Sequence, residues 1–173
     1  MKRVSFFTTI AGISLLFLGF CAYAAGIRVN TTRSIPVGLY WLSDVPVSKG
    51  EYVIFCPPVN ALFDEAKKRG YFNSGFCPGQ YGYIMKMNLA AKSDKVSVTD
   101  QGVFVNGVLL PYSKPRSMDK SGRPLPVYRG DIVLSENDML LMSDVSELSF
   151  DSRYYGPVSR SQIQGVIRPI FTW

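Results

Sequence analysis

Hydrophobic and polar positions divide the chain into two unequal parts. After a short basic N-terminus (MKR), residues 4–26 (VSFFTTIAGISLLFLGFCAYAAG) contain no charged side chain. A helix of about 20 apolar residues crosses the hydrocarbon core of a bilayer, so this run is long enough to span it. We therefore treat residues 1–25 as an N-terminal membrane or signal segment and residues 26–173 as a separate domain.

The ends of the apolar run indicate its orientation. Lys2 and Arg3 lie on its short N-terminal side, which predicts that this side stays in the cytoplasm and that the domain is exported. The alternative is a cleaved signal peptide, because Ala22-Tyr23-Ala24 forms an A-x-A pattern at the end of the run. We favour a retained anchor over cleavage. Both interpretations place the domain on the far side of the membrane.

Short apolar runs separated by Gly, Pro, Asn and Asp dominate the exported part. The runs are EYVIF (51–55), YGYIMKM (81–87), KVSVT (95–99), GVFVNGVLL (102–110), DIVL (131–134), MLLMS (139–143) and GVIRPIF (165–171). Runs of this length and composition are typical of β-strands, and the Asn-Gly pair within GVFVNGVLL predicts a hairpin. We therefore expect a mainly β domain with folded or barrel-like sheets.

Two segments interrupt the strand pattern. NALFDEAKKRGYF (60–72) has apolar residues at helical spacing and ends near Gly70, which predicts a short helix on a surface insertion. PYSKPRSMDKSGRPLPVYRGD (111–131) is polar and rich in proline and glycine, which predicts an exposed loop.

Three cysteines bear on the export prediction. An exported domain meets an oxidising compartment, where disulfides form and persist. Cys56 and Cys77 flank the helical insertion, and each is followed directly by proline. We expect a disulfide between them, worth about 3 kcal/mol in the chain-entropy account. Two independent buried thiols are the alternative, and Cys21 lies in the apolar segment.

Charge and composition narrow the possible functions. The formal net charge is +6, but the basic residues are scattered and no nucleic-acid motif accompanies them. Such a charge favours contact with anionic headgroups over nucleic-acid binding. The chain contains no histidine, which excludes a Ser-His-Asp triad, a Cys-His dyad and a histidine-based zinc site. The cysteine spacings are also unlike a metal knuckle, so we expect neither metal nor cofactor.

A serine and a lysine remain as candidate catalytic groups. Ser34 lies in NTTRSIPVGLYWL (30–42), and a serine hydroxyl is a weak nucleophile until a base accepts its proton. A lysine can be that base when burial keeps its amine neutral, and Lys86 is the lysine that lies within an apolar run, GYIMKMNLAA. Taken singly, each residue has an ordinary explanation, because serine is common in turns and a strand lysine commonly extends its amine into water.

Three motifs, in this order, resemble the serine-lysine signal peptidases. They are T-x-S-x-P-x-G-x-Y (32–40), KMNLAAKSD (86–94) and SFDSRYYG (149–156). The resemblance is strongest to the conjugative-transfer, TraF-type branch, whose members process the pilin of a mating apparatus. The family usually has glycine where this chain has Ser93, a departure that affects the shape of a turn and not the lysine.

The resemblance implies roles for the catalytic groups. Ser34 would attack the scissile carbonyl, and neutral Lys86 would act as general base and then general acid. The Ser34 backbone N–H and the Thr32 hydroxyl match the positions that stabilise the oxyanion.

The same resemblance implies supporting roles near the C-terminus. Ser149 matches a serine that orients the lysine amine. Asp151 and Arg153 are expected to form an ion pair behind the site, because a carboxylate touching the lysine would raise its pKa and oppose catalysis. A purely structural role for this pair fits equally well.

These implications together predict a periplasmic endopeptidase at the inner membrane, working with the conjugation apparatus. Its expected substrate is a precursor pilin or another small exported protein, and the branch can also yield a cyclic product. A general leader peptidase is one alternative. A non-catalytic, membrane-anchored assembly component is the other, and the joint presence of Ser34 and Lys86 favours catalysis over it.

Overall fold

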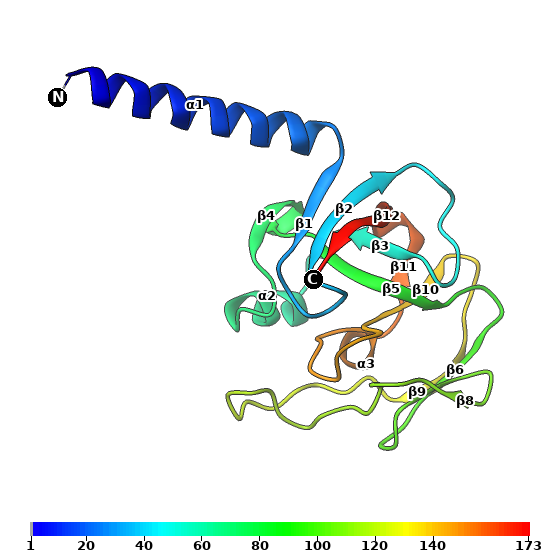
Figure 1. Ribbon diagram of the computed structural model, residues 1–173. Helices are drawn as coiled ribbons and strands as arrows, with labels where there is room; N and C mark the ends of the chain where they lie inside the picture. Colours follow the sequence, from blue (N-terminus) through cyan, green and yellow to red (C-terminus); the bar gives the residue numbers. More distant parts are fainter. Residues whose placement is uncertain (1) are drawn as a thin grey trace.

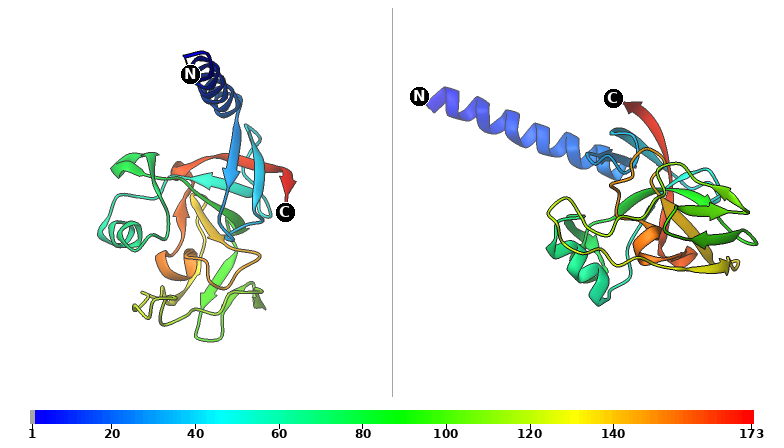
Figure 2. Two further views of the ribbon diagram at one scale, coloured as in Figure 1. Left: turned by 60° about the vertical axis from the view of Figure 1, so that its left-hand side comes forward. Right: turned by 90° about the horizontal axis from the view of Figure 1, so that it is seen from below.

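The computed structural model describes residues 2–173, with side chains from Phe6 onward. Helix α1 (Lys2–Ala24) projects away from the rest of the protein, as Figures 1 and 2 show. Among the described residues, Phe6–Ala24 alone has the length and apolar composition of a membrane-spanning helix, and none of it is buried against the domain. The prediction of one apolar N-terminal helix is therefore confirmed.

Two antiparallel sheets form the domain. The larger sheet has the order β1-β2-β12-β3-β5-β10-β11, and the smaller has the order β8-β7-β6-β9. The larger comprises β1 (Ile27–Asn30), β2 (Gly38–Ser43), β3 (Tyr52–Phe55), β5 (Ile84–Ala90), β10 (Asp138–Met142), β11 (Val158–Ser159) and β12 (Ile163–Thr172). The smaller comprises β6 (Lys95–Val98), β7 (Val103–Val105), β8 (Val108–Leu109) and β9 (Gly130–Val133). The prediction of a mainly β domain is confirmed.

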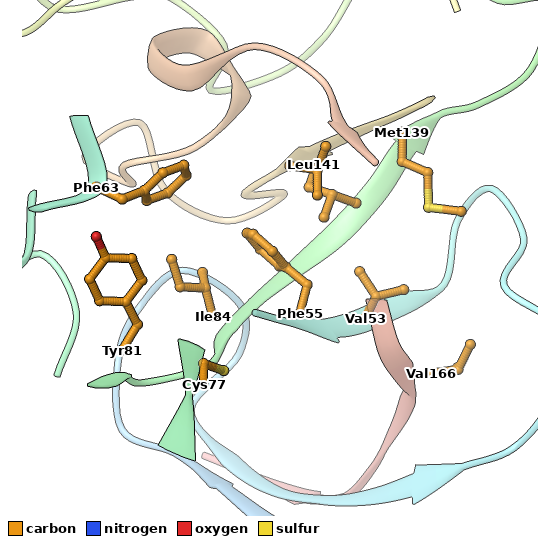
Figure 3. Close-up of a cluster of buried hydrophobic side chains, with 10 residues drawn as sticks. Val53, Phe55, Phe63, Cys77, Tyr81, Ile84, Met139, Leu141 and Val166 are labelled. Carbon is orange, nitrogen blue, oxygen red and sulfur yellow. The ribbon is translucent and has the colours of Figure 1, made fainter. Parts of the chain in front are cut away.

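Strand β10 supplies both main parts of the hydrophobic core. Successive strand residues point to opposite faces, so Met139 and Leu141 enter one cluster while Leu140 and Met142 enter the other. In Figure 3, Leu141 lies between Phe63 and Met139 of the first cluster. The second cluster joins the two sheets. Its buried members are Ala90, Val96, Val98, Val103, Val105, Leu134, Leu140 and Met142.

The predicted helical insertion is present and is closed by the expected disulfide. Cys56 and Cys77 are bonded, and helix α2 (Ala61–Lys68) begins where the Asn60 side chain accepts a hydrogen bond from the Phe63 N–H at 3.0 Å. The insertion is more than a surface feature, however. Phe63 is 2% exposed and packs into the first core cluster, so the helix helps to build the domain.

Several short elements were not predicted. Strands β1 and β2 form a hairpin on either side of the Ser34 loop, with Asn30 paired to Gly38. Strand β4 (Ser74–Cys77), helix α3 (Ser152–Tyr155) and the 3-10 turns η1 (Pro78–Gln80) and η2 (Arg160–Gln162) complete the described elements. Each is short and carries a weak local signal.

Candidate active site

One buried asparagine shapes the loop that carries Ser34. The side-chain amide of Asn30 donates to the carbonyls of Thr32, Ile35 and Pro36 at 2.8, 3.0 and 3.0 Å. Its Oδ1 accepts from the Thr32 N–H at 3.1 Å and from the Thr32 hydroxyl at 2.9 Å. Asn30 was not predicted from the sequence, although asparagine is a recognised turn former that bonds to the backbone two residues on.

The rest of the serine motif holds the hairpin in place. The hydroxyl of the fully buried Tyr40 donates to the carbonyl of Pro36. A Cβ atom added to Gly38 would lie 2.2 Å from the carbonyl oxygen of Phe171 on β12, so a larger residue would force β2 and β12 apart. Proline, glycine and tyrosine therefore fix the backbone around the nucleophile candidate.

The Ser34 loop packs against strand β5 next to the lysine. The Ser34 hydroxyl lies 2.9 Å from the Thr32 hydroxyl and donates to the carbonyl of Met85 at 3.3 Å. Met85 directly precedes Lys86 on β5. Thr32, Ser34, Lys86 and Ser149 all line one cavity of about 890 Å³. The structure thus brings together four of the six candidate site residues.

Lys86 is buried without a compensating partner. Its side chain belongs to a strand held between β3 and β10, and only 3% of the residue is exposed. No hydrogen bond or ion pair of its Nζ occurs within residues 2–173. Burial lowers the Lys86 pKa to about 8. The nearby Asp151 carboxylate raises this pKa, and the charge of Arg153 lowers it. At pH 7 about a tenth of such an amine is neutral.

Asp151 and Arg153 lie behind the cavity. Their side chains are fully buried, and Arg153 Nε and Nη2 donate to the two carboxylate oxygens of Asp151 at 2.8 Å each. The Asp151 carboxylate also accepts from the Ser143 N–H at 3.2 Å. It makes no hydrogen bond to Lys86, so it acts on the lysine through its charge alone.

Arg153 also holds together segments that are distant in the sequence. Burial by itself would lower the pKa of Arg153, but the hydrogen bond and charge of Asp151 raise it. The remaining guanidinium N–H groups donate to the backbone carbonyls of Tyr112, Lys114, Glu147 and Ser149. All five guanidinium N–H groups therefore have acceptors, as a buried guanidinium requires.

The Ser149 hydroxyl is unpaired, unlike the side chains of Asp151 and Arg153. The hydroxyl is buried and has no hydrogen-bond partner within the described part of the chain. An unpaired buried hydroxyl costs about 1–3 kcal/mol, and this one lines the same cavity as Lys86. The hydroxyl is therefore available to a group inside the cavity.

The turn after β5 forms with Ser93 at the position where the family usually has glycine. Ser93 takes φ +69°, the left-handed conformation that glycine adopts easily. The following residue, Asp94, secures the turn by accepting from the Ala91 N–H, Lys49 Nζ and Asn106 Nδ2 at 3.0, 3.0 and 2.6 Å. The turn keeps its shape without glycine, at the cost of backbone strain.

The predicted exposed loop forms one wall of the cavity. Asp119 accepts hydrogen bonds from the Tyr71 hydroxyl and from Arg123 Nε at 2.6 Å each, and Arg69 Nη1 donates to the Pro124 carbonyl at 2.7 Å. The bonds of Tyr71 and Arg69 tie the loop to the disulfide-closed insertion. We call residues 116–125 the loop wall, because most of them line the cavity. Their polar composition carried no signal of this placement.

A partly buried hydroxyl and a desolvated amine in one cavity are the groups that a serine peptidase without histidine requires. Residues 1–173 match the family described as signal peptidase, peptidase S26, and the chain belongs to that family. The predicted family resemblance is confirmed.

Similar proteins include plasmid and conjugal transfer proteins. The chain is 59% identical over 174 residues to the plasmid transfer protein TraF of Escherichia coli, covering 100% of this chain and 98% of that protein. It is 35% identical over 174 residues to the conjugal transfer protein TraF of Agrobacterium fabrum strain C58, covering 99% of this chain and 97% of that protein. A crystal structure of a signal peptidase I from Enterococcus faecalis V583 aligns with TM-score 0.41 and 15% identity, over 73% of this chain and 100% of that one.

Proposed function

We propose that the protein is a serine endopeptidase with a Ser34–Lys86 dyad that processes an exported precursor protein. The observation that carries this proposal is the buried, unpartnered Lys86 amine in the same cavity as the Ser34 hydroxyl. A buried lysine without an ion pair is costly to keep charged, and a neutral amine is a competent proton acceptor.

In the proposed reaction, Ser34 Oγ attacks the scissile carbonyl carbon while its proton passes to Lys86 Nζ. The carbon–nitrogen bond then breaks, and Lys86 returns the proton to the leaving amine, which leaves an ester on Ser34. Water attacks this ester with Lys86 again as the base, and Ser34 regains its proton. The free Ser149 hydroxyl is available to orient the amine through these steps.

The oxyanion would be stabilised by the Ser34 N–H and the Thr32 hydroxyl. The Ser34 N–H has no hydrogen-bond partner among the described residues. The Thr32 hydroxyl donates to Asn30 Oδ1 in this structure, so its O–H bond has to turn away from Asn30 to serve the oxyanion. Each such donor is worth about 3–4 kcal/mol in comparable sites.

We infer that the substrate is the precursor pilin of a conjugative transfer system. Relatives along the full chain are named as plasmid and conjugal transfer proteins. The apolar helix and the Cys56–Cys77 disulfide support a domain exported to the periplasm and held at the inner membrane. If an amine of the substrate intercepts the ester in place of water, the product is cyclic and one water lighter than the linear form.

Mass spectrometry of candidate pilin precursors, encoded on the same genetic element and incubated with the purified full-length protein, tests the proposal. Cleavage is expected with the wild type and with Ser97→Ala, a serine on the smaller sheet, and no cleavage with Ser34→Ala. Intact masses with the wild type would instead support a non-catalytic assembly component. A product one water lighter than linear would identify cyclisation.

A further inference from the structure

Charge is distributed very unevenly around the cavity. Among its lining residues, Asp119 alone is acidic. The basic lining residues are Arg33, Arg69, Lys86, Arg116, Lys120 and Arg123. A cavity lined by one sign of charge concentrates ligands of the opposite sign.

Internal ion pairs compensate only part of this positive charge. Arg123 is paired with Asp119 at 2.6 Å, and Arg69 is paired with Glu65 at 2.8 Å. Arg116 reaches Glu147 only at 3.7 Å, with both side chains well exposed. Apart from Lys86, the proposed base, two cations remain fully uncompensated.

The uncompensated cations are Arg33 and Lys120, which have no side-chain hydrogen bond or ion pair within residues 2–173. Arg33 directly precedes Ser34, and Lys120 belongs to the loop wall. The loop wall is held in a defined shape, because Asp119 Oδ1 accepts from the N–H groups of Ser121 and Arg123 at 2.8 and 2.9 Å. The backbone that carries Lys120 is therefore fixed, and Lys120 and Arg33 line the same cavity.

We infer that this cavity binds an acidic segment of the substrate, a peptide with carboxylates flanking the bond that Ser34 attacks. This inference rests on the proposed peptidase function and specifies its substrate class. Each carboxylate that pairs with Arg33, Arg116 or Lys120 at the cavity rim strengthens binding about threefold, the gain typical of exposed ion pairs.

Anionic lipid headgroups are the other chemistry that such a patch attracts. Figures 1 and 2 place the 111–129 loop on the side of the domain opposite to α1. Arg116 and Lys120, however, line the cavity that also holds the Ser34 hydroxyl, where a peptide substrate has to bind. This shared cavity favours a peptide over a membrane surface.

Peptide binding to the full-length Ser34→Ala protein, in zwitterionic detergent, tests the inference without requiring cleavage. The probes are fluorescent alanine-rich peptides that differ only in two flanking positions, occupied by Glu, Gln or Lys. Anisotropy is expected to show about tenfold tighter binding of the Glu peptide than of the Gln peptide at low salt, and weaker binding of the Lys peptide. The preference should fade at about 1 M salt, where the Debye length is about 3 Å.

Charge variants locate the binding site. Lys120→Gln, added to Ser34→Ala, is expected to reduce the Glu-over-Gln preference about threefold, and Lys120→Glu to reduce it further and improve binding of the Lys peptide. Lys95→Gln, which removes an exposed lysine of β6 outside this cavity, should leave the preference intact.

Equal binding of the three peptides to Ser34→Ala would overturn the inference, even if the wild type cleaves pilin precursors. Acidic preference without any cleavage by the wild type would support the acidic site and contradict the proposed function. Phosphatidylglycerol vesicles test the lipid alternative. If Lys120→Gln abolished binding to these vesicles and the peptides showed no preference, the patch would be a lipid site and the inference would be overturned.

Discussion

The two sides of the cavity are built in opposite ways. The Ser34 side is local and open, because one side chain, Asn30, organises the loop through bonds that reach no more than six residues along the chain. The Lys86 side is long-range and closed, because Arg153 behind it contacts a carbonyl 41 residues away at Tyr112. A nucleophile has to be reached by substrate, whereas an amine base has to be kept from water.

The difference also separates two kinds of vulnerability. Changes on the Ser34 side alter hydrogen bonds at a partly buried loop, where a lost bond costs about 0.5–1.5 kcal/mol. Changes behind Lys86 leave a buried charge without its partner, which lowers the free energy of unfolding by several kcal/mol. We therefore expect variants on the open side to lose activity while staying folded, and variants on the closed side to lose stability as well.

Substitution of the base should have the largest effect on activity. Lys86→Ala and Lys86→Arg are expected to lower kcat/KM about 10⁴-fold, the upper range for loss of a general base, because a guanidinium stays protonated. Peptide cleavage assays measure this, with thermal unfolding to confirm folding and Lys95→Arg as the control. Near-normal turnover by folded Lys86→Arg would remove Lys86 from the base role.

Breaking the buried ion pair should have the largest effect on stability. Arg153→Leu leaves the Asp151 carboxylate buried and unpaired, and is expected to reduce the free energy of unfolding by about 3–5 kcal/mol. Denaturant titration measures this loss. Arg168→Leu, which removes an exposed arginine 3.8 Å from Glu51, should cost far less. Similar losses for the two variants would mean that the closed side is not held by this pair.

On the open side, Thr32→Val should affect catalysis without affecting stability comparably. Loss of an oxyanion donor is expected to lower kcat about 10²-fold with little change in KM, while Thr32→Ser keeps the hydroxyl and most of the activity. A valine variant with an unchanged kcat would show that the Thr32 hydroxyl serves only to bond Asn30.

Activity should also depend on pH through Lys86. With its pKa near 8, kcat/KM is expected to fall about tenfold for each pH unit below 8 and to level off above it. The stability change has the same sign. The folded pKa lies below the unfolded value of 10.5, so the unfolded chain binds more protons and stability rises between about pH 8 and 10.5. An acidic limb at pH 4–5 would indicate a carboxylate base instead.

Local sequence patterns predicted much of the fold. The Asn106-Gly107 turn has positive φ at both residues, 52° and 81°, as the hairpin motif predicts. Lys86 could be proposed as the base because it lies within an apolar run, and Ser34 as the nucleophile because its T-x-S-x-P-x-G-x-Y motif resembles that of the family. Strand β2 was missed because its place depends on the close approach of Gly38 to β12. The loop wall was missed because its defining bond joins Tyr71 to Asp119, 48 residues apart.

The smallest expected effect lies outside both sides of the cavity, at the turn after β5. Ser93 adopts φ +69°, a left-handed conformation that costs a non-glycine residue about 1–2 kcal/mol. Ser93→Gly removes this strain but gives the unfolded chain more freedom, worth about 0.5–1 kcal/mol. We expect a net gain of about 0.5–1 kcal/mol in the free energy of unfolding, and unchanged activity because Ser93 does not line the cavity.

The reverse substitution at another position with positive φ provides a control for this last prediction. Gly107 has φ +81° and open space where a Cβ would lie, so Gly107→Ser introduces backbone strain without a steric clash. It should lower the free energy of unfolding by about as much as Ser93→Gly raises it, and the two melting temperatures should move in opposite directions by about 1–4 °C. If Gly107→Ser is destabilising but Ser93→Gly is not stabilising, Ser93 gains more from its surroundings than its backbone loses, since the strain at the two positions is of the same kind.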